Sequence, residues 1–69
     1  MRIQLNGTWH DWPTPDPPLA EVLAQLGLTP ETGGVAVAVN LAVVPRSRWS
    51  EHRLAEGDTI EVVTARQGG

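Results

Sequence analysis

The sequence ends in Gly68 and Gly69, and the only group these residues offer to chemistry is a main-chain carboxylate. This carboxylate is ionised at neutral pH and can attack the α-phosphorus of ATP to give an acyl-adenylate. A sulfur nucleophile can then displace AMP and leave a thiocarboxylate. Glycine is costly to order and termini commonly fray. The two glycines are therefore either a frayed end or a working terminus.

The absence of side chains on the last two residues would let the chain pass through a narrow channel in a partner protein. Six residues, 64–69, extend at most about 20 Å. Arg66 and Gln67 precede the glycines and either contact such a partner or are merely solvated. No glycine-rich phosphate-binding motif is present, so the nucleotide site would have to belong to the partner.

Composition excludes several other kinds of chemistry. The 69 residues make one domain, without cysteine for nucleophilic catalysis, disulfides or thiolate metal sites. No lysine is present either, and the five cations are all arginine. The two histidines, His10 and His52, have no ligand spacing that predicts a metal site.

Charge and hydropathy bear on partners and location. The net charge of −3 argues against nucleic acid, because phosphate-backbone binding requires a basic surface. The longest apolar run, residues 35–39, is far shorter than the roughly 20 residues of a membrane span. The first residues lead into a strand pattern with no signal peptide. We expect a cytoplasmic protein that binds neither nucleic acid nor membrane.

The first twelve residues predict a β-hairpin. Asn6-Gly7 is a strong signal for a two-residue type I′ turn, which sets Arg2 opposite Asp11 and Gln4 opposite Trp9. Those four side chains point outward, and the other face points to the core: Ile3, Leu5, Thr8, His10 and Trp12. An outward tryptophan is a candidate partner-binding residue, because tryptophan is enriched at interface hot spots.

A proline-rich stretch and a short amphipathic helix follow the hairpin. Asp16 is predicted to cap the helix N-terminus, with Pro17 in the first turn. Gly27 is predicted to end the helix. The apolar stripe repeats at helical spacing: Leu19, Val22, Leu23 and Leu26.

The second half of the chain predicts three strands. Residues 35–39 are apolar throughout, which indicates a central strand covered on both faces, and residues 42–44 form a second short strand. Residues 46–54 are too short and polar for a core element and predict a helical turn with a loop, in which Trp49 covers the end of the core. Residues 59–63 form the last strand.

The predicted order is β-β-α-β-β-β, an α+β arrangement. So few residues can bury a one-faced helix only by laying it across the sheet. The first and last strands then pair in parallel at the centre of a mixed five-stranded sheet. This is the β-grasp (ubiquitin-like) fold, over residues 1–63, with a flexible C-terminal tail over residues 64–69.

The sequence resembles the ThiS family of sulfur carrier proteins of thiamin biosynthesis. The resemblance lies in "IQLNG" near the start, in "VAVAVN" followed by "VVPRSRW", in "LAEGDTIEVV" and in the terminal "GG". The second of these contains a Val-Pro-Arg-x-x-Trp motif that starts at Val44. Residues 9–18 are richer in tryptophan and proline than the family's usual segment, and the Asn40-Leu41 turn lacks a glycine.

The resemblance implies a carrier or cosubstrate and not an enzyme. Gly69 would be adenylated by an E1-like adenylating enzyme of the ThiF type and converted to a thiocarboxylate. Sulfur would come from a cysteine persulfide, supplied by a cysteine desulfurase or another donor, and pass to thiazole synthase of the ThiG type. ATP would be used by the partner, with no cofactor bound to this chain. Gly68, Gln67 and Arg66 would form the tail that the partners read.

Three alternatives stay open at this point: a molybdopterin-type sulfur carrier, a ubiquitin-like protein modifier and a β-grasp binding module of the small RNA-associated kind. The Val-Pro-Arg-x-x-Trp motif and the short length favour the thiamin branch. Gln67 stands where ubiquitin has arginine, which argues against the modifier. The acidic charge argues against the binding module.

Overall fold

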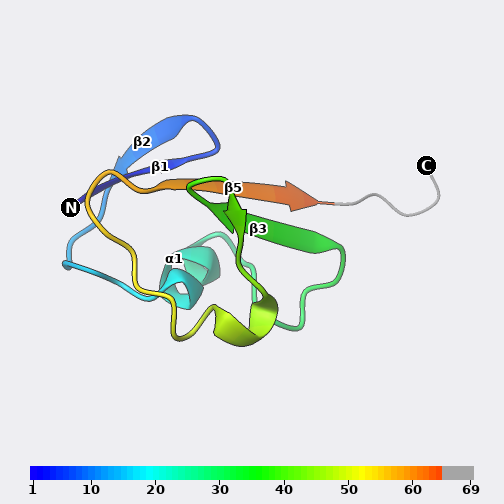
Figure 1. Cartoon of the computed structure of the whole chain (residues 1–69). Coiled ribbons are helices and arrows are strands. Elements are labelled where there is room, and N and C mark those ends of the chain that lie inside the picture. The colour runs from blue at the N-terminus through cyan, green and yellow to red at the C-terminus, as the bar shows by residue number, and fades with distance from the viewer. Residues whose placement is uncertain (65–69) are drawn as a thin grey trace.

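The computed structural model describes residues 1–64 (Figure 1). The elements in chain order are β1 (Arg2–Leu5), β2 (Thr8–Asp11), α1 (Leu19–Gln25), β3 (Val35–Val39), β4 (Ala42–Val43), the 3₁₀ turn η1 (Arg46–Arg48) and β5 (Thr59–Thr64). The last strand is one residue longer than predicted and β4 one residue shorter. The remaining predicted tail, residues 65–69, lies outside the described residues.

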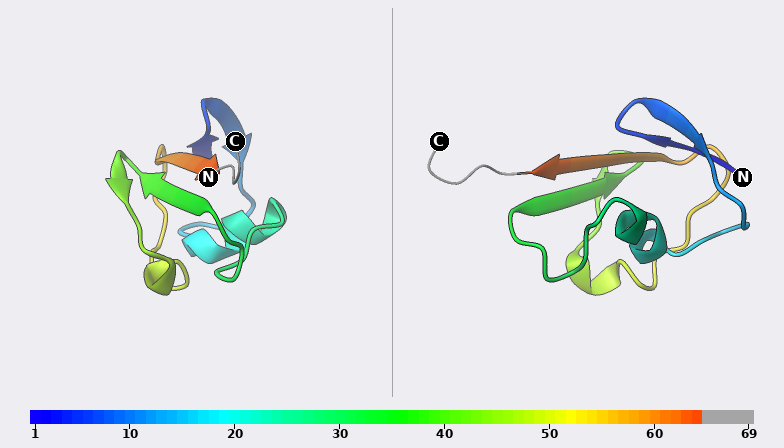
Figure 2. Two further views of the ribbon diagram at one scale, coloured as in Figure 1. Left: turned by 90° about the vertical axis from the view of Figure 1, so that its right-hand side faces the viewer. Right: turned by 180° about the vertical axis from the view of Figure 1, so that it is seen from behind.

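The five strands form one mixed sheet in the order β2-β1-β5-β3-β4. β1 and β5 pair in parallel at the centre, and every other neighbouring pair is antiparallel. The helix α1 and the η1 segment lie against one face of this sheet, and the other face is left open (Figures 1 and 2). The predicted mixed five-stranded sheet and its parallel central pair are confirmed.

The first hairpin has the predicted register, with Arg2 opposite Asp11 and Gln4 opposite Trp9. The turn residue Asn6 has a φ of 48°, as a type I′ turn requires. The prediction that Thr8 and His10 reach the core is wrong, because every residue of β2 is exposed. β2 is an edge strand, and its inward-facing side chains lie beyond the cover that the helix gives.

The start of α1 differs from the prediction. The helix begins at Leu19 after Pro18, and no side chain caps it, so the cap assigned to Asp16 and the first-turn position of Pro17 are wrong. The Leu19 and Ala20 N–H groups instead donate to main-chain carbonyls of the segment after η1, at 2.7 and 2.9 Å. Those carbonyls satisfy the free N–H groups that a capping carboxylate would otherwise bind.

The end of α1 confirms the role of Gly27, which has a φ of +79°. Its N–H donates to the Ala24 carbonyl and the Leu28 N–H donates to the Leu23 carbonyl, which is the hydrogen-bond pattern of a Schellman motif. Leu26 is 45% exposed, so its predicted place in the buried stripe is wrong. It is the C-cap residue, where the chain already turns away from the core.

Strand β3 alternates between buried and open positions. Val35, Val37 and Val39 are buried, whereas Ala36 is exposed and Ala38 is partly exposed. The prediction that both faces are covered is therefore wrong. The apolar run reflects small alanines on the open face of the sheet and valines against the helix.

The core lies between the sheet and the helix. Its buried side chains come from β1, α1, β3 and β5 and from the segments that follow β4 and η1. They are Ile3, Leu19, Val22, Leu23, Val35, Val37, Val39, Val44, Trp49, Leu54 and Ile60. The predicted packing role of Trp49 is confirmed. Because Trp49 and Leu54 are each 1% exposed, residues 46–54 do contribute to the core, contrary to the prediction from their polarity.

Candidate functional site

Four of the five predicted site residues lie outside the described residues: Arg66, Gln67, Gly68 and Gly69. The structure describes the strand that precedes them, β5, up to Thr64. It also describes the fifth, Trp9, on β2. The candidate site is therefore built from the end of β5 and from the face of the sheet that Trp9 shares, and the residues that fix the beginning of β5 lie outside it.

β5 pairs with a strand on each side, but over different lengths. Its pairing with β3 extends from Ile60 opposite Val39 to Thr64 opposite Val35. On the other side, its parallel pairing with β1 covers only Thr59 and Ile60. The last four residues of the strand therefore have a ladder partner on one side only.

The beginning of β5 is fixed by side chains of two turns. The Asn40 Nδ2–H donates to Asp58 Oδ1, and Asn40 Oδ1 accepts from the Thr59 N–H, both at 3.0 Å. Asp58 Oδ2 also accepts from the Ala55 N–H at 2.8 Å. These bonds set where the last strand enters the sheet.

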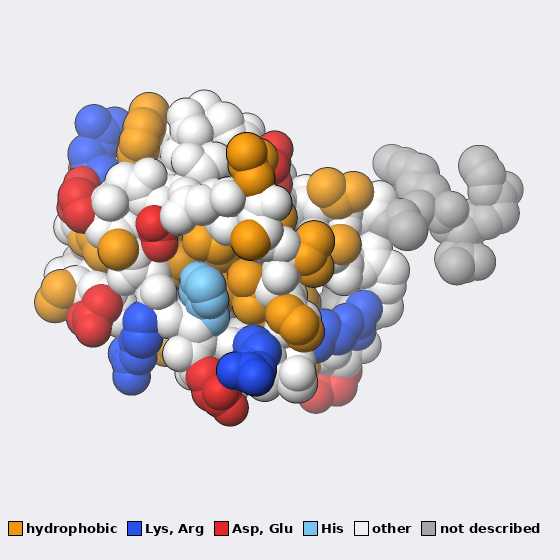
Figure 3. Space-filling model, in the orientation of Figure 1, with side chains coloured by type: hydrophobic (Ala, Val, Ile, Leu, Met, Phe, Trp, Pro, Cys, Tyr) orange, Lys and Arg blue, Asp and Glu red, His pale blue; other side chains and the backbone are white. Residues whose placement is uncertain are grey.

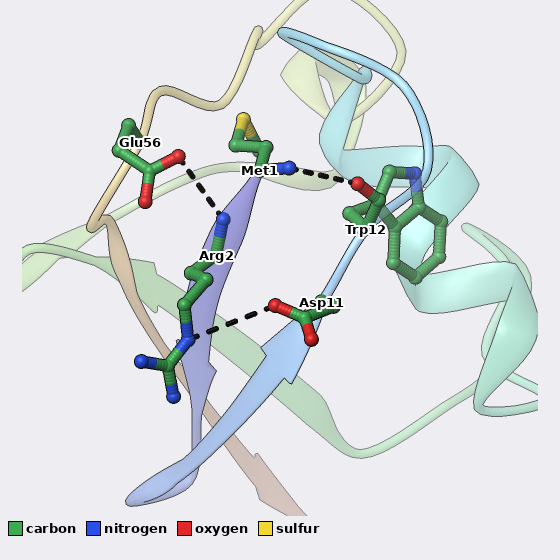
Figure 4. A network of polar contacts seen from close by, with 5 residues as sticks. All are labelled: Met1, Arg2, Asp11, Trp12 and Glu56. Atoms are coloured by element: carbon green, nitrogen blue, oxygen red, sulfur yellow. Dashed lines mark hydrogen bonds and ion pairs between the residues drawn. The ribbon is translucent and has the colours of Figure 1, made fainter.

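Trp9 points outward, as predicted, and is 46% exposed. The Arg2 guanidinium lies 4.9 Å from the centre of its ring, a cation–π distance, and Arg2 Nε lies 3.7 Å from Asp11 Oδ1. Figure 4 shows Arg2 between Asp11 and Glu56, whose Oε1 accepts from the Arg2 N–H at 3.1 Å. The indole is thus a partly exposed surface held against an ordered arginine.

The open face of the sheet also carries aliphatic side chains. Val43 of β4 and Val63 of β5 are 72% and 63% exposed, and the register places Ala36 opposite Val63 and Ala38 opposite Val43. We call these four residues the open-face patch. Figure 3 shows that hydrophobic side chains also gather over the β3, β4 and β5 side of that view. The register places the exposed Glu61 on the same open face, opposite Ala38.

A shallow groove of about 440 Å³ lies beside β4. Its apolar wall includes Val44 and Pro45, and Arg48, His52 and Arg53 lie along it. Within residues 1–64, no three histidine or acidic side chains gather closely enough to hold a metal ion. In the same part of the chain, no helix has the length and hydropathy needed to cross a membrane.

The open-face patch was missed by the reading of the sequence, although one signal could have found it. Val62 and Val63 are adjacent in a strand, so period-two alternation requires that one of them point away from the core. The alternation of valine and alanine in β3 carries the same information.

The strand order, the parallel central pair and the single helix across one face define a ubiquitin-like β-grasp protein. A crystal structure of the thiamine biosynthesis protein (ThiS) from Geobacter metallireducens superposes with a TM-score of 0.83 at 23% identity, over 100% of both chains. A solution structure of a thiamine biosynthesis protein from the same organism gives 0.77 at 23% identity, over 100% of this chain and 88% of the other. No curated protein matches the sequence.

The family assignment comes from the sequence. The ThiS family model matches residues 3–69, and the chain belongs to the ThiS family. The match includes the terminal Gly68-Gly69 pair, which the structure does not describe. Membership supports a sulfur carrier role in thiamine biosynthesis.

Proposed function

We propose that the protein carries sulfur for thiazole formation as a thiocarboxylate on the carboxyl group of Gly69. The observation that carries this proposal is the family match over residues 3–69, which includes both terminal glycines. Because the family supports a carrier role, we assign the chain the role of a cosubstrate and not of an enzyme. We assign the reaction to the cytoplasm.

The chemistry has three steps, all of them carried out on partner enzymes. The Gly69 carboxylate attacks the α-phosphorus of ATP in a ThiF-type adenylating enzyme, and pyrophosphate leaves. The terminal sulfur of a cysteine persulfide then attacks the carbonyl carbon and AMP leaves, which gives an acyl disulfide. A thiol cleaves its S–S bond and releases the thiocarboxylate, which thiazole synthase of the ThiG type uses as its sulfur source.

The open-face patch supports docking on a protein partner. It lies on β5, β3 and β4, and β5 is the strand from which the sequence continues toward Gly69. Trp9 is exposed on the same side of the sheet, at the far edge strand β2. We propose that the adenylating enzyme covers this face while Arg66, Gln67 and Gly68 lead the carboxylate into its nucleotide site.

Intact mass measurement tests the proposal directly. The chain is incubated with ATP, a ThiF-type enzyme and sulfide, whose attack on the adenylate gives the thiocarboxylate and AMP. We expect a mass change equal to the exchange of one oxygen for one sulfur, located in the C-terminal peptide. Deletion of Gly69 is expected to abolish the change, and an Arg48→Gln variant is the matched control that should react normally.

Three outcomes would contradict the proposal. An unchanged mass with several competent adenylating enzymes would exclude the carrier role. Adducts in which the chain is joined through Gly69 to lysines of other proteins would instead identify a ubiquitin-like modifier. Sulfur transfer to a molybdopterin precursor and not to thiazole synthase would move the carrier to the other sulfur pathway.

A further inference from the structure

The parallel ladder between β1 and β5 ends in an unusual way. The Gln4 N–H donates to the Asp58 carbonyl and the Asn6 N–H donates to the Ile60 carbonyl, both at 2.9 Å. In a regular parallel ladder the next bond would run from the Val62 N–H to the main-chain carbonyl of residue 6. Residue 6, however, has already entered the hairpin turn, with a φ of 48°.

The side chain of Asn6 makes that next bond in place of its main chain. Asn6 Oδ1 accepts from the Val62 N–H at 2.8 Å, and Asn6 Nδ2–H donates to the Val62 carbonyl at 3.4 Å. The amide therefore extends the ladder by one step past the end of β1. Asn6 binds both main-chain polar groups of Val62 on this side, and the β3 register places Val37 opposite Val62 on the other side.

We infer that Asn6 is a positioning residue for delivery of the C-terminal carboxylate, acting through the main chain of Val62. This inference rests on the proposed function. Val62 lies two residues before the end of the described strand, in the half of β5 that β1 does not reach. The β3 ladder holds this half of the strand along one side, and the side-chain amide of Asn6 adds a hold along the other side, so that the two together fix the direction of the strand end.

The kinetic consequence follows from the two hydrogen bonds. Both are solvent-exposed, so their loss loosens the end of β5 without unfolding the domain. A smaller fraction of molecules then holds the strand end in the competent direction, which weakens apparent affinity by that fraction. The complex, once bound, is unchanged. We therefore expect loss of the two bonds to raise KM and to leave kcat unchanged.

The chain offers a matched pair of variants. Asn6→Gly removes both side-chain bonds but still allows the positive φ, because Gly-Gly is a permitted type I′ turn. Asn40→Gly removes two equivalent bonds, also from a residue with positive φ, but at Thr59 and Asp58 at the beginning of β5. Both positions are exposed, so the two variants should lose similar amounts of stability.

The first readout is hydrogen exchange of single amides by NMR. In Asn6→Gly we expect the Val62 amide to exchange at least about fivefold faster, since a bond of about 1 kcal/mol is lost. In Asn40→Gly we expect the faster exchange at Thr59 and not at Val62. This measurement uses the free chain and does not depend on any activity.

The second readout is the rate of pyrophosphate release by a ThiF-type enzyme as the carrier concentration is varied. Asn6→Gly should raise KM by about threefold to tenfold with kcat within about twofold, and Asn40→Gly should leave both near the wild-type values. Asn6→Asp keeps the acceptor for the Val62 N–H but turns a carboxylate oxygen toward the Val62 carbonyl oxygen in place of the N–H donor. It should therefore return KM only part of the way from the Asn6→Gly value to the wild-type value.

The possible failures are distinguishable. If the wild-type chain is adenylated and Asn6→Gly has the same KM, or if both glycine variants raise KM equally, the positioning role is wrong and the proposed function stands. If the wild-type chain is not adenylated, the proposed function fails and the positioning role fails with it. Unchanged exchange at Val62 in Asn6→Gly would overturn the inference before any kinetics.

Discussion

Trp49 combines a packing role with a polar one. Its side chain is 1% exposed, and its Nε1–H donates to the Val44 carbonyl at 3.0 Å in a buried hydrogen bond. The indole therefore fills the end of the core and also satisfies a main-chain carbonyl just after β4. A buried tryptophan whose N–H is paired in this way is hard to replace by another aromatic residue.

We expect Trp49→Phe to lower the free energy of unfolding by about 2–4 kcal/mol, as the sum of a cavity and an unpaired buried carbonyl. Trp9→Phe is the matched control and should change it by less than about 0.5 kcal/mol, because Trp9 is exposed. Urea denaturation followed by circular dichroism measures both. Equal losses in the two variants would show that the buried hydrogen bond contributes nothing.

The residues that the sequence predicted well are those whose conformation depends on near neighbours. Asn6-Gly7 set the hairpin register through two φ values, and period-two alternation then turned Trp9 outward. Trp49 was identified as a packing residue from its size and type. Exposure of Thr8 and His10 was not predictable in this way, because it depends on how far the helix extends across the sheet.

The helix α1 is defined differently at its two ends. Its C-terminus is set by residues close in the sequence, since the Schellman motif joins the Gly27 and Leu28 N–H groups to carbonyls of the preceding turn. Its N-terminus is set by residues that are distant in the sequence. The Leu19 and Ala20 N–H groups donate to the carbonyls of His52 and Trp49, respectively. The sequence therefore predicted Gly27 correctly and assigned the N-cap wrongly to Asp16, whose nearby carboxylate was the only acceptor visible without the fold.

Two glycines allow a test of the C-terminal motif. Gly27 has a φ of +79° and Gly33 lies outside the left-handed region, and a Cβ at either position would have nothing within 4 Å. We expect Gly27→Ala to destabilise the domain by about 1 kcal/mol through backbone strain alone. Gly33→Ala should be neutral or stabilise it by up to about 1 kcal/mol, because it restricts the unfolded chain.

Thermal unfolding of the two variants side by side measures the difference. Each adds one methyl group in open space, so packing cannot account for any difference between them. If both variants lower the melting temperature by the same amount, the loss of stability does not arise from the positive φ of Gly27. The Schellman motif would then not stabilise the helix end.

The molecule as a whole has one covered and one open side. α1 and the segment after η1 cover one face of the sheet, and the open-face patch with Trp9 lies on the other (Figure 2). The fold class and the parallel central pair could be predicted, because helix amphipathicity and strand count leave few arrangements for a short chain. The exposure of the inward-facing residues of β2 could not, because that depends on the area that one seven-residue helix can shield.

The last prediction concerns that open side and rests on the proposed function. Val43→Asp places a charge in the open-face patch, at a side chain that is 72% exposed. The free energy of unfolding should change by less than about 0.5 kcal/mol. Burying an unpaired carboxylate against the adenylating enzyme should, however, raise KM for the carrier about tenfold or more.

Gln25→Glu is the matched control, because it adds the same charge to an exposed residue of α1 on the covered side of the sheet. It should leave KM within about twofold, since it changes net charge without entering the interface. If both variants raise KM equally, the enzyme responds to the overall charge of the carrier. If neither does, the adenylating enzyme docks elsewhere, and the exposed valines of β4 and β5 need another explanation.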